Sequence, residues 1–163
     1  MTPTFERLHR RHLLDAFDSD VPVLDTWLKQ YAGQSARAGI AVTYVAHVDD
    51  VVVGYYALAA GEIAREDAPA ALTRRTPPRP IPVIRLARLA VDRSYQGRGL
   101  GGGLLREALH GCLNASDVVG ARAVIVDAKD DAAAAFYRHF GFTAYPSDPH
   151  RLYVTMDVLR ASL

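Results

Sequence analysis

Hydrophobic residues follow two different periods along this chain, and their order predicts a mixed fold of strands and helices. Runs rich in β-branched and aromatic residues predict strands at residues 5–8, 40–48, 51–60, 83–91, 121–126, 142–145 and 151–156. Apolar residues spaced three or four apart predict helices that begin near Pro22 and that span 100–118 and 131–140. We therefore expect one α/β (α+β) domain over residues 1–163, in which helices flank a mixed sheet.

Several apolar side chains are expected in the core of this domain. The first helix should pack inward through one face, which consists of Leu24, Trp27, Leu28 and Tyr31. The single cysteine, Cys112, lies among apolar residues of a predicted helix, which indicates a core thiol and excludes an internal disulfide. A mainly structural, inward role is also expected for Phe136, Phe140 and Phe142.

The segment 64–82 interrupts the regular pattern, because it contains five prolines. Proline lacks the N–H group that a central strand must donate, so we predict a surface loop with a short helix. Residues 65–99 contain eight arginines against three acidic residues, a net charge of +5, whereas the rest of the chain carries −4. Such a region suits a partner with many phosphates, and scattered charges on a solvated loop are the alternative reading.

Other features of the whole sequence exclude several classes of protein. No apolar run approaches the roughly 20 residues of a membrane span. The N-terminus lacks the basic and then apolar pattern of a signal peptide, so we expect a cytoplasmic protein that does not bind a membrane. The six histidines lack the spacing of metal ligands and have no adjacent serine or cysteine nucleophile, so we predict no metal site.

The most specific local feature is a glycine cluster that follows the predicted strand 83–91 and opens the predicted helix 100–118. The cluster consists of Gly97, Gly99, Gly101, Gly102 and Gly103. The first N–H groups of a helix have no partner within it, and the helix dipole favours negative charge there, so this turn suits a pyrophosphate. A dinucleotide fingerprint would follow its strand directly and would meet an acidic strand end about 20 residues later, and neither condition holds.

Two ordered motifs resemble those of the GNAT acetyltransferases. Gln96-x-x-Gly99-x-Gly101 resembles the acyl-CoA loop of that family, and residues 133–142 resemble its last helix and the following strand. The resemblance implies a mixed central sheet that splays between its two middle strands, with acetyl-CoA as cosubstrate. It also implies the following acetyl-CoA contacts: Leu89, Ala90, Val91, Gln96, Gly97, Arg98, Gly99, Leu100, Gly101, Gly102 and Phe136.

The same resemblance implies that Tyr137 is the catalytic general acid, which protonates the departing CoA thiolate. A phenol with a pKa of roughly 10 is a suitable donor to a thiolate with a pKa of roughly 8.5 or above. No residue stands out as a general base. An α-amine with a pKa of about 8 is partly neutral without one, whereas a lysine amine at about 10.4 is not, so an α-amino acceptor is favoured.

Further segments along nearly the whole chain resemble the TacT branch of GNAT toxins, which acetylate the amino acid on aminoacyl-tRNA and so block translation. These segments are residues 17–19, 24–28, 54–59, 87–92, 96–101 and 136–142. The resemblance implies a homodimer whose basic surface binds tRNA, and a ribbon-helix-helix antitoxin that silences the toxin. The candidate tRNA contacts are Arg74, Arg75, Arg79, Arg85, Arg88 and Arg93.

Two residues depart from the pattern of that branch, and two other functions stay open. Asp20 stands where glycine is common, and Arg85 lies in a strand that is usually apolar there, where it either meets a phosphate or pairs with a carboxylate. A GNAT enzyme for a small amine, an aminoglycoside or a protein N-terminus is the first alternative, although a cationic acceptor calls for an acidic cleft. A non-catalytic partner in a repressor complex is the second, against which Tyr137 and the glycines argue.

Overall fold

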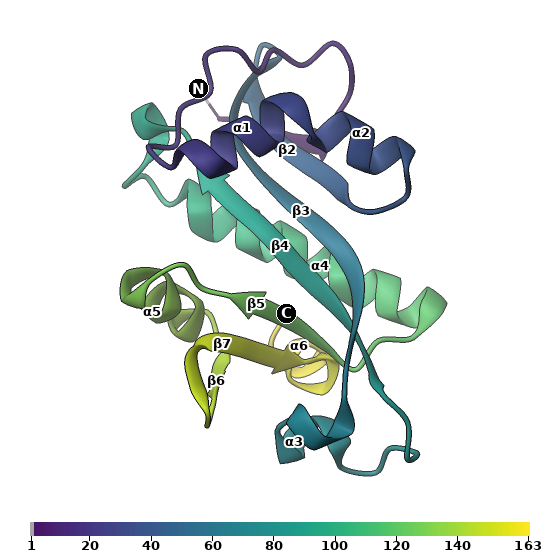
Figure 1. The fold of residues 1–163 in the computed structure, drawn as a ribbon. Helices are drawn as coiled ribbons and strands as arrows, with labels where there is room; N and C mark the ends of the chain where they lie inside the picture. Colours follow the sequence, from purple (N-terminus) through teal and green to yellow (C-terminus); the bar gives the residue numbers. More distant parts are fainter. Residues whose placement is uncertain (1) are drawn as a thin grey trace. The chain divides into compact units, whose positions relative to one another are not determined.

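The computed structural model describes residues 2–163 and contains a seven-stranded sheet flanked by helices (Figure 1). The strands are β1 (Thr4–Arg7), β2 (Val42–Val48), β3 (Val51–Ile63), β4 (Ile81–Val91), β5 (Ala123–Asp127), β6 (Thr143–Tyr145) and β7 (Asp148–Thr155). Their order is β1-β2-β3-β4-β5-β7-β6. The pair β4–β5 is parallel, whereas β1–β2, β2–β3, β5–β7 and β6–β7 are antiparallel, so the predicted mixed sheet is confirmed.

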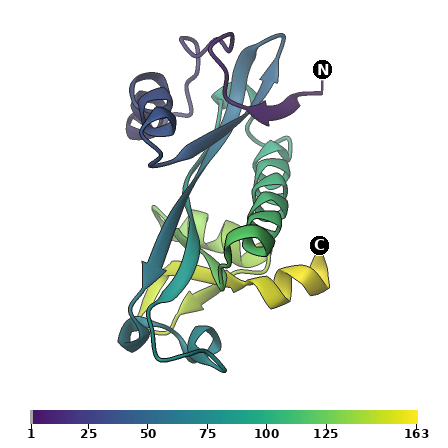
Figure 2. The ribbon, with the colours of Figure 1, turned by 90° about the vertical axis from the view of Figure 1, so that its right-hand side faces the viewer.

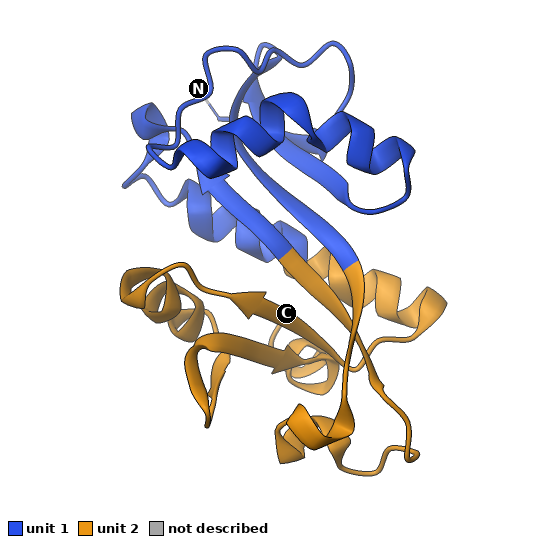
Figure 3. Cartoon of the chain, viewed as in Figure 1, with its two compact units in different colours: residues 1–59, 87–108 blue, residues 60–86, 109–163 orange. Residues whose placement is uncertain are grey.

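The helices are α1 (Pro22–Gln30), α2 (Ala32–Arg37), α3 (Ala70–Thr73), α4 (Leu100–Val119), α5 (Asp131–His139) and α6 (Met156–Ser162). Two short 3₁₀ turns, η1 (Arg65–Asp67) and η2 (Arg93–Tyr95), complete the elements. The chain divides into two compact units, coloured separately in Figure 3. The first contains the residues up to Ala59 together with Ala87–Ala108, and the second contains Ala60–Leu86 and Leu109–Leu163. No helix among residues 2–163 is long and apolar enough to cross a membrane.

The first unit is built around β1, β2 and the first part of β3. Helices α1 and α2 cover one face of these strands, and the N-terminal part of α4 lies on the opposite face (Figure 2). The core on the α1 side consists of Phe17, Leu28, Ala32, Val45, Val52, Tyr55 and Ala90. The Tyr55 hydroxyl donates to the carbonyl oxygen of Leu24 at 2.7 Å, which ties α1 to β3.

The second unit has its own core, and this core holds the proline-rich loop, residues 64–82, in place. Helices α5 and α6 pack against β7. The buried cluster consists of Ile63, Leu72, Ile81, Val83, Ala123, Ile125 and Tyr145. Leu72 lies on α3 and is fully buried, so the short predicted helix fixes the loop to this core. Within this unit β4 pairs with β5 from Val83 to Arg85, and β4 continues beyond that pairing to Val91.

Several sequence predictions are wrong in detail. Tyr31 and Phe140 were expected inside, but 49% and 38% of their surfaces are exposed, because each follows the last residue of a helix and leaves its buried face. The helices α2 and α6 were not predicted. The last strand, β7, ends at Thr155, and α6 begins at the next residue, Met156. The predicted core positions of Cys112 and Phe142 are confirmed.

Candidate functional site

The glycine turn, residues 96–103, connects the end of β4 to α4 within the first unit. Gly97 and Gly99 have φ angles of 77° and 82°, in the left-handed region that favours glycine. A Cβ atom at either position would meet no other atom within 4 Å, so open space lies beside this backbone. Gly103 N–H donates to the Gly99 carbonyl oxygen at 3.1 Å. The N–H groups of residues 100–102 lie before this hydrogen bond, at the positive end of α4, where helical N–H groups have no partner within the helix. The turn can therefore hold phosphate oxygens with its backbone.

Gln96 fixes the start of the glycine turn. Its Nε2 donates to the carbonyl oxygens of Val91, at 2.9 Å, and of Ser19, at 3.1 Å. Ser19 is itself buried, and its hydroxyl donates to Asp25 Oδ1 on α1 at 2.6 Å. The side chain of Gln96 thus ties the turn to β4 and to the segment before α1, and its predicted contact with acetyl-CoA remains a prediction.

Asp92 braces the turn from the other side. Its Oδ1 accepts from Asp18 N–H at 2.9 Å, and its Oδ2 accepts from the N–H and hydroxyl of Ser94 at 3.0 and 2.6 Å. Burial raises the pKa of Asp92, but the hydrogen bonds from Ser94 and Asp18 outweigh it, so the pKa lies below its usual value. Asp20, in the segment before α1, has a φ of 68°, which suits the glycine that is common at this position and which aspartate adopts more readily than most other residues.

Gly54 on β3 lets α4 approach the sheet closely. A Cβ atom there would lie 2.7 Å from Leu104 Cδ1 and 3.4 Å from Leu100 Cδ2, both on α4. It would also lie 3.4 Å from the carbonyl oxygen of Ala90 on β4. The N-terminal part of α4, which carries the glycine turn, therefore packs directly on the backbone of β3.

The strand segment that precedes the turn is Leu89, Ala90 and Val91, the last three residues of β4. Ala90 is buried in the core of the first unit, whereas Leu89 and Val91 are half-buried and alternate to the opposite face. Nothing in their side chains is chemically reactive. Hydrogen bonds to a substrate at these residues must therefore come from their backbone groups.

Tyr137 lies on α5 in the second unit, and 7% of its surface is exposed. The Asp130 carboxylate accepts from Ala133 N–H at 2.8 Å and so starts this helix. The Tyr137 ring meets Phe136 and Phe142 edge to face, with centroids 5.2 and 5.5 Å apart. Burial raises the pKa of Tyr137 to about 12, so its hydroxyl stays protonated at neutral pH.

The proline-rich loop is held in shape by Arg65. Its Nη1 donates to Thr76 Oγ1 at 2.6 Å and to the Pro77 carbonyl at 2.7 Å. The next arginines along the chain, Arg74 and Arg75, are exposed. Arg75 has a φ of 60°, an uncommon conformation for a residue other than glycine.

A cavity of about 490 Å³ brings Arg74 and Arg75 together with Arg122 in the second unit. Arg122 Nη2 donates to the carbonyl oxygens of Ala71 and Arg74, both at 3.4 Å, and its Nη1 pairs with Asp157 at 3.3 Å. Sequence reasoning missed Arg122. Its one signal was an arginine directly before a buried strand, which is not specific.

The structure gives Arg85 and Arg93 carboxylate partners. Arg85 Nη1 lies 3.9 Å from Asp127 Oδ2 on the neighbouring strand β5, which is the second of the two alternatives raised for it. Arg93 Nη1 lies 3.4 Å from Asp18 Oδ2. Such exposed ion pairs are weak, so neither pairing excludes a contact with phosphate.

Arg88, Arg98 and Arg79 have no carboxylate partner among residues 2–163. The guanidinium of Arg88 lies 4.2 Å from the centroid of the Trp27 ring, and that of Arg98 lies 5.0 Å from the Tyr95 ring. A cation held over an aromatic face keeps its N–H donors available at its edge.

The structure also brings together Glu6, His12 and His47, which sequence reasoning did not connect. Glu6 Oε2 contacts Nε2 of His47 and lies 3.3 Å from Nε2 of His12. The Nδ1 atoms of His12 and His47 accept from the N–H groups of His9, at 2.9 Å, and Asp50, at 3.1 Å. In the neutral rings the proton therefore lies on Nε2 and points at Glu6. This pattern favours a hydrogen-bonded cluster over a metal site, because a ligating Nε2 must carry no proton.

Comparison with known families identifies the fold and its chemistry. A profile described as the acetyltransferase (GNAT) domain matches residues 39–144, which include the glycine turn and Tyr137. The chain belongs to the GNAT family of acetyltransferases. This GNAT enzyme is 47% identical over 146 residues, 90% of this chain and 87% of the relative, to the tRNA-acetylating toxin of Mycobacterium tuberculosis (strain ATCC 25618 / H37Rv).

Two solved structures resemble this GNAT enzyme over nearly its whole length. One is AtaT complexed with acetyl-methionyl-tRNAfMet, with a TM-score of 0.89, 27% identity and coverage of 98% of both chains. The other is a mutant AtaT toxin bound to the C-terminus of the antitoxin AtaR and to acetyl-CoA, with a TM-score of 0.83, 27% identity, and coverage of 99% of this chain and 97% of that one. The predicted GNAT fold, acetyltransferase class and resemblance to the TacT-like toxins are confirmed.

Proposed function

We propose that this GNAT enzyme transfers an acetyl group from acetyl-CoA to the α-amino group of the amino acid on aminoacyl-tRNA, and so inhibits translation. The 47% identity to a tRNA-acetylating toxin over 90% of the chain carries the proposal. The AtaT structures with acetyl-CoA, with acetyl-methionyl-tRNAfMet and with the antitoxin AtaR support the cosubstrate, the substrate class and the kind of partner.

In this proposal the glycine turn binds the pyrophosphate of acetyl-CoA. The N–H groups at the start of α4 point along the helix axis, and the left-handed conformation of Gly97 and Gly99 leaves the backbone open. The backbone of Leu89, Ala90 and Val91 is the proposed contact for the pantetheine arm. Gln96 acts on the cofactor indirectly, because its amide holds the turn against Val91 and Ser19.

Tyr137 is the proposed general acid. Its raised pKa ensures that the proton is present at neutral pH, since the phenol must be neutral to donate. When the amine attacks the thioester carbon and the carbon–sulfur bond breaks, the phenol proton passes to the departing sulfur. A thiolate also gains proton affinity in apolar surroundings, so the burial that makes the phenol a weaker acid makes the departing sulfur a stronger base as well.

The nucleophile must be a neutral amine, and an α-amino group is partly neutral without a base from the enzyme. An α-amine with a pKa of about 8 has a neutral fraction of roughly one tenth at pH 7, so no strong base is required. The proton released after attack passes to water or buffer. An α-amino acceptor is thus chemically easier for this enzyme than the ammonium of a lysine or a polyamine.

The proposed tRNA contacts are arginines whose guanidinium groups have free donors. In the second unit these are Arg74 and Arg75, whose loop Arg122 supports through backbone carbonyl groups, and the exposed Arg79. In the first unit the best candidate is Arg88, which lies on Trp27 without a carboxylate partner. We further propose a homodimer and a ribbon-helix-helix antitoxin as partner.

The test measures transfer of radiolabelled acetyl from acetyl-CoA to charged tRNA, with uncharged tRNA, spermidine and an aminoglycoside as parallel acceptors. We expect label on charged tRNA alone. Tyr137→Phe should lower the rate on the order of 10²- to 10⁴-fold while acetyl-CoA still binds. Tyr145→Phe is the matched control, because it removes another buried phenol hydroxyl of the same unit, one that has no hydrogen-bond partner among residues 2–163.

Two results would contradict the proposal. Label on spermidine or the aminoglycoside in place of charged tRNA would move the substrate to the small amines. An unchanged rate in Tyr137→Phe would remove its assignment as the general acid and leave the acetyltransferase fold in place.

A further inference from the structure

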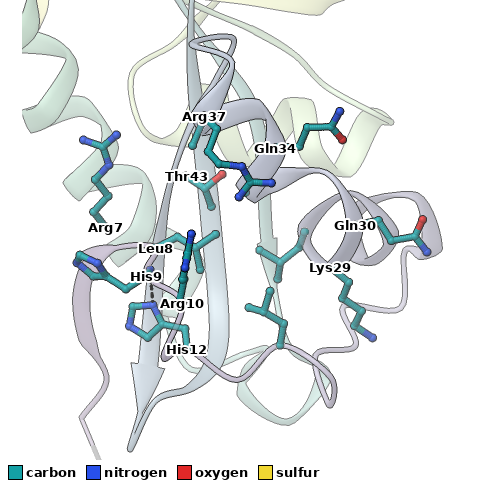
Figure 4. A pocket seen from close by; sticks show the side chains of 14 residues that line it. Arg7, Leu8, His9, Arg10, His12, Lys29, Gln30, Gln34, Arg37 and Thr43 are labelled. Atoms are coloured by element: carbon teal, nitrogen blue, oxygen red, sulfur yellow. Dashed lines mark hydrogen bonds between the residues drawn. The ribbon is translucent and has the colours of Figure 1, made fainter.

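A second basic cavity lies in the first unit, and its lining includes none of the residues assigned to acetyl-CoA or tRNA above. Its volume is about 430 Å³, and it lies between β1, the segment that follows β1, α1, α2 and β2 (Figure 4). Its basic lining consists of Arg7, His9, Arg10, His12, Lys29 and Arg37. No aspartate or glutamate lines it.

The four permanent cations of this cavity are unpaired. Arg7, Arg10, Lys29 and Arg37 are exposed, and none of them has an ion pair or side-chain hydrogen bond within residues 2–163. Other arginines of the same unit do have partners, as Arg11 does with Glu6. These four cations border the cavity from different elements, and in Figure 4 Arg7 and Lys29 extend away from Arg10 and Arg37. Such a spread of positive charge attracts an extended polyanion.

Thr43 gives the cavity a buried polar contact. Its side chain lines the cavity from β2, it is 2% exposed, and its Oγ1 has no hydrogen-bond partner within the described chain. A buried hydroxyl without a partner destabilises a fold, and such groups are rare in native proteins. A ligand oxygen inside the cavity would accept from this hydroxyl.

Gly33 leaves room for the side chain of Arg37 beside the cavity. A Cβ atom on Gly33 would lie 3.3 Å from Arg37 Nη1, so the glycine leaves room for the guanidinium to fold back along α2. Gln30 and Gln34 also line the cavity, and in Figure 4 their amide groups extend outward from it. All of these groups suit oxygen acceptors that carry negative charge, and a set without a carboxylate does not suit a metal ion.

We propose that this cavity binds the phosphodiester backbone of tRNA, an inference that rests on the proposed function. Its four cations come from four parts of the chain, namely β1, the segment after β1, α1 and α2. Four cations are more than a single phosphate group needs. Successive phosphates of a nucleic acid strand can pair with cations spread in this way. Such contacts fix the position of the nucleic acid without reading its sequence.

The test is the affinity of the full-length protein for uncharged tRNA, measured by fluorescence anisotropy over a range of salt concentrations. In the double variant Arg10→Gln with Arg37→Gln we expect the Kd to rise about tenfold at low salt. The slope of log affinity against log salt should shrink by about 0.9 for each phosphate that the variant no longer binds. Arg106→Gln is the control, because it removes an exposed, unpaired arginine from α4 of the same unit, outside the cavity.

The variant Thr43→Val distinguishes a loss of tRNA binding from a loss of folding stability. Valine matches the shape of threonine and removes only the hydroxyl, so the free energy of unfolding should stay the same or rise. The affinity for tRNA should nevertheless fall a fewfold. A decrease in stability equal to the decrease in binding would instead give Thr43 a structural role and overturn its assignment as a ligand contact.

Parallel titrations with inorganic pyrophosphate and with polyglutamate identify the ligand class. If tRNA affinity and its salt slope are unchanged in the double variant, the proposal is overturned, whether or not either small probe binds more weakly. Because the assay uses uncharged tRNA without acetyl-CoA, it does not depend on catalysis. Weaker tRNA binding by the variant would support the cavity even if charged tRNA proved not to be acetylated.

Discussion

Replacing Gly54 by alanine tests whether α4 packs on the backbone of β3 as closely as the structure shows. The new Cβ atom would lie 2.7 Å from Leu104 Cδ1, and Leu104 is fully buried, so its side chain has little room to move. Overpacking of this kind costs about 1–3 kcal/mol, and the higher strand propensity of alanine offsets about 0.5–1 kcal/mol of it. We therefore expect Gly54→Ala to lower the free energy of unfolding by about 1–2 kcal/mol.

Urea denaturation followed by tryptophan fluorescence suits this prediction, because Trp27 is the only tryptophan and lies in the same unit as Gly54. A change of that size should lower the urea midpoint by about 0.5–1 M. Gly111→Ala is the control. Gly111 lies on α4, and a Cβ atom added there would meet no other atom within 4 Å, so this change should raise stability by about 0.5–1 kcal/mol through helix propensity.

A double-mutant cycle sharpens the test. Leu104→Ala alone should cost about 2–5 kcal/mol, but it also removes the atom that the new methyl group would strike. The double variant should then be more stable than the sum of the single effects by about 1 kcal/mol or more. Purely additive effects, or a Gly54→Ala protein as stable as the parent, would refute the close contact.

Two further predictions follow from titratable groups. Hydrogen bonds from Arg11 and His47 hold the pKa of Glu6 at about 2, below its ordinary 4.5, so its contribution to stability is present above pH 4.5 and is lost as the pH falls toward 2. Glu6→Gln should flatten the thermal stability profile across that window, and a profile as steep as the parent's would contradict the cluster. Burial raises the pKa of the Cys112 thiol to about 12, so a disulfide reagent should modify it only after unfolding, and rapid labelling of the native protein would disprove its burial.

The part of the site that depends on backbone conformation could be predicted from the sequence. Gly97 and Gly99 adopt the left-handed φ values that only glycine accommodates easily, and they lie within one short turn. A local run of residues is enough to indicate such a turn and the helix that follows. The same holds for α5, since Asp130 caps it as its position before an alanine-rich run suggests.

The contacts between distant segments could not be predicted in this way. Gln96 bonds to Ser19, 77 residues earlier, and Glu6 meets His47, 41 residues later, and neither pair has a local signal. The helix α2 contains Gly33 and Ser35, which favour helices poorly, so its helical form reflects packing of Ala32 in the core rather than propensity. For α6 the sequence did contain a signal, since threonine is a favoured N-cap residue. In the structure the Thr155 hydroxyl oxygen accepts from Val158 N–H at 3.2 Å and so caps this helix.

The two kinds of phosphate recognition proposed for this chain place different constraints on its sequence. The glycine turn acts through N–H groups, so it tolerates changes of neighbouring side chains as long as Gly97 and Gly99 keep their conformation. The proposed tRNA contacts would act through exposed side chains such as Arg74 and Arg37, and each can be exchanged without disturbing a core. Substitutions on the basic surfaces are therefore expected to alter how tightly tRNA is bound and how it is positioned, while the acetyl-CoA turn stays the same.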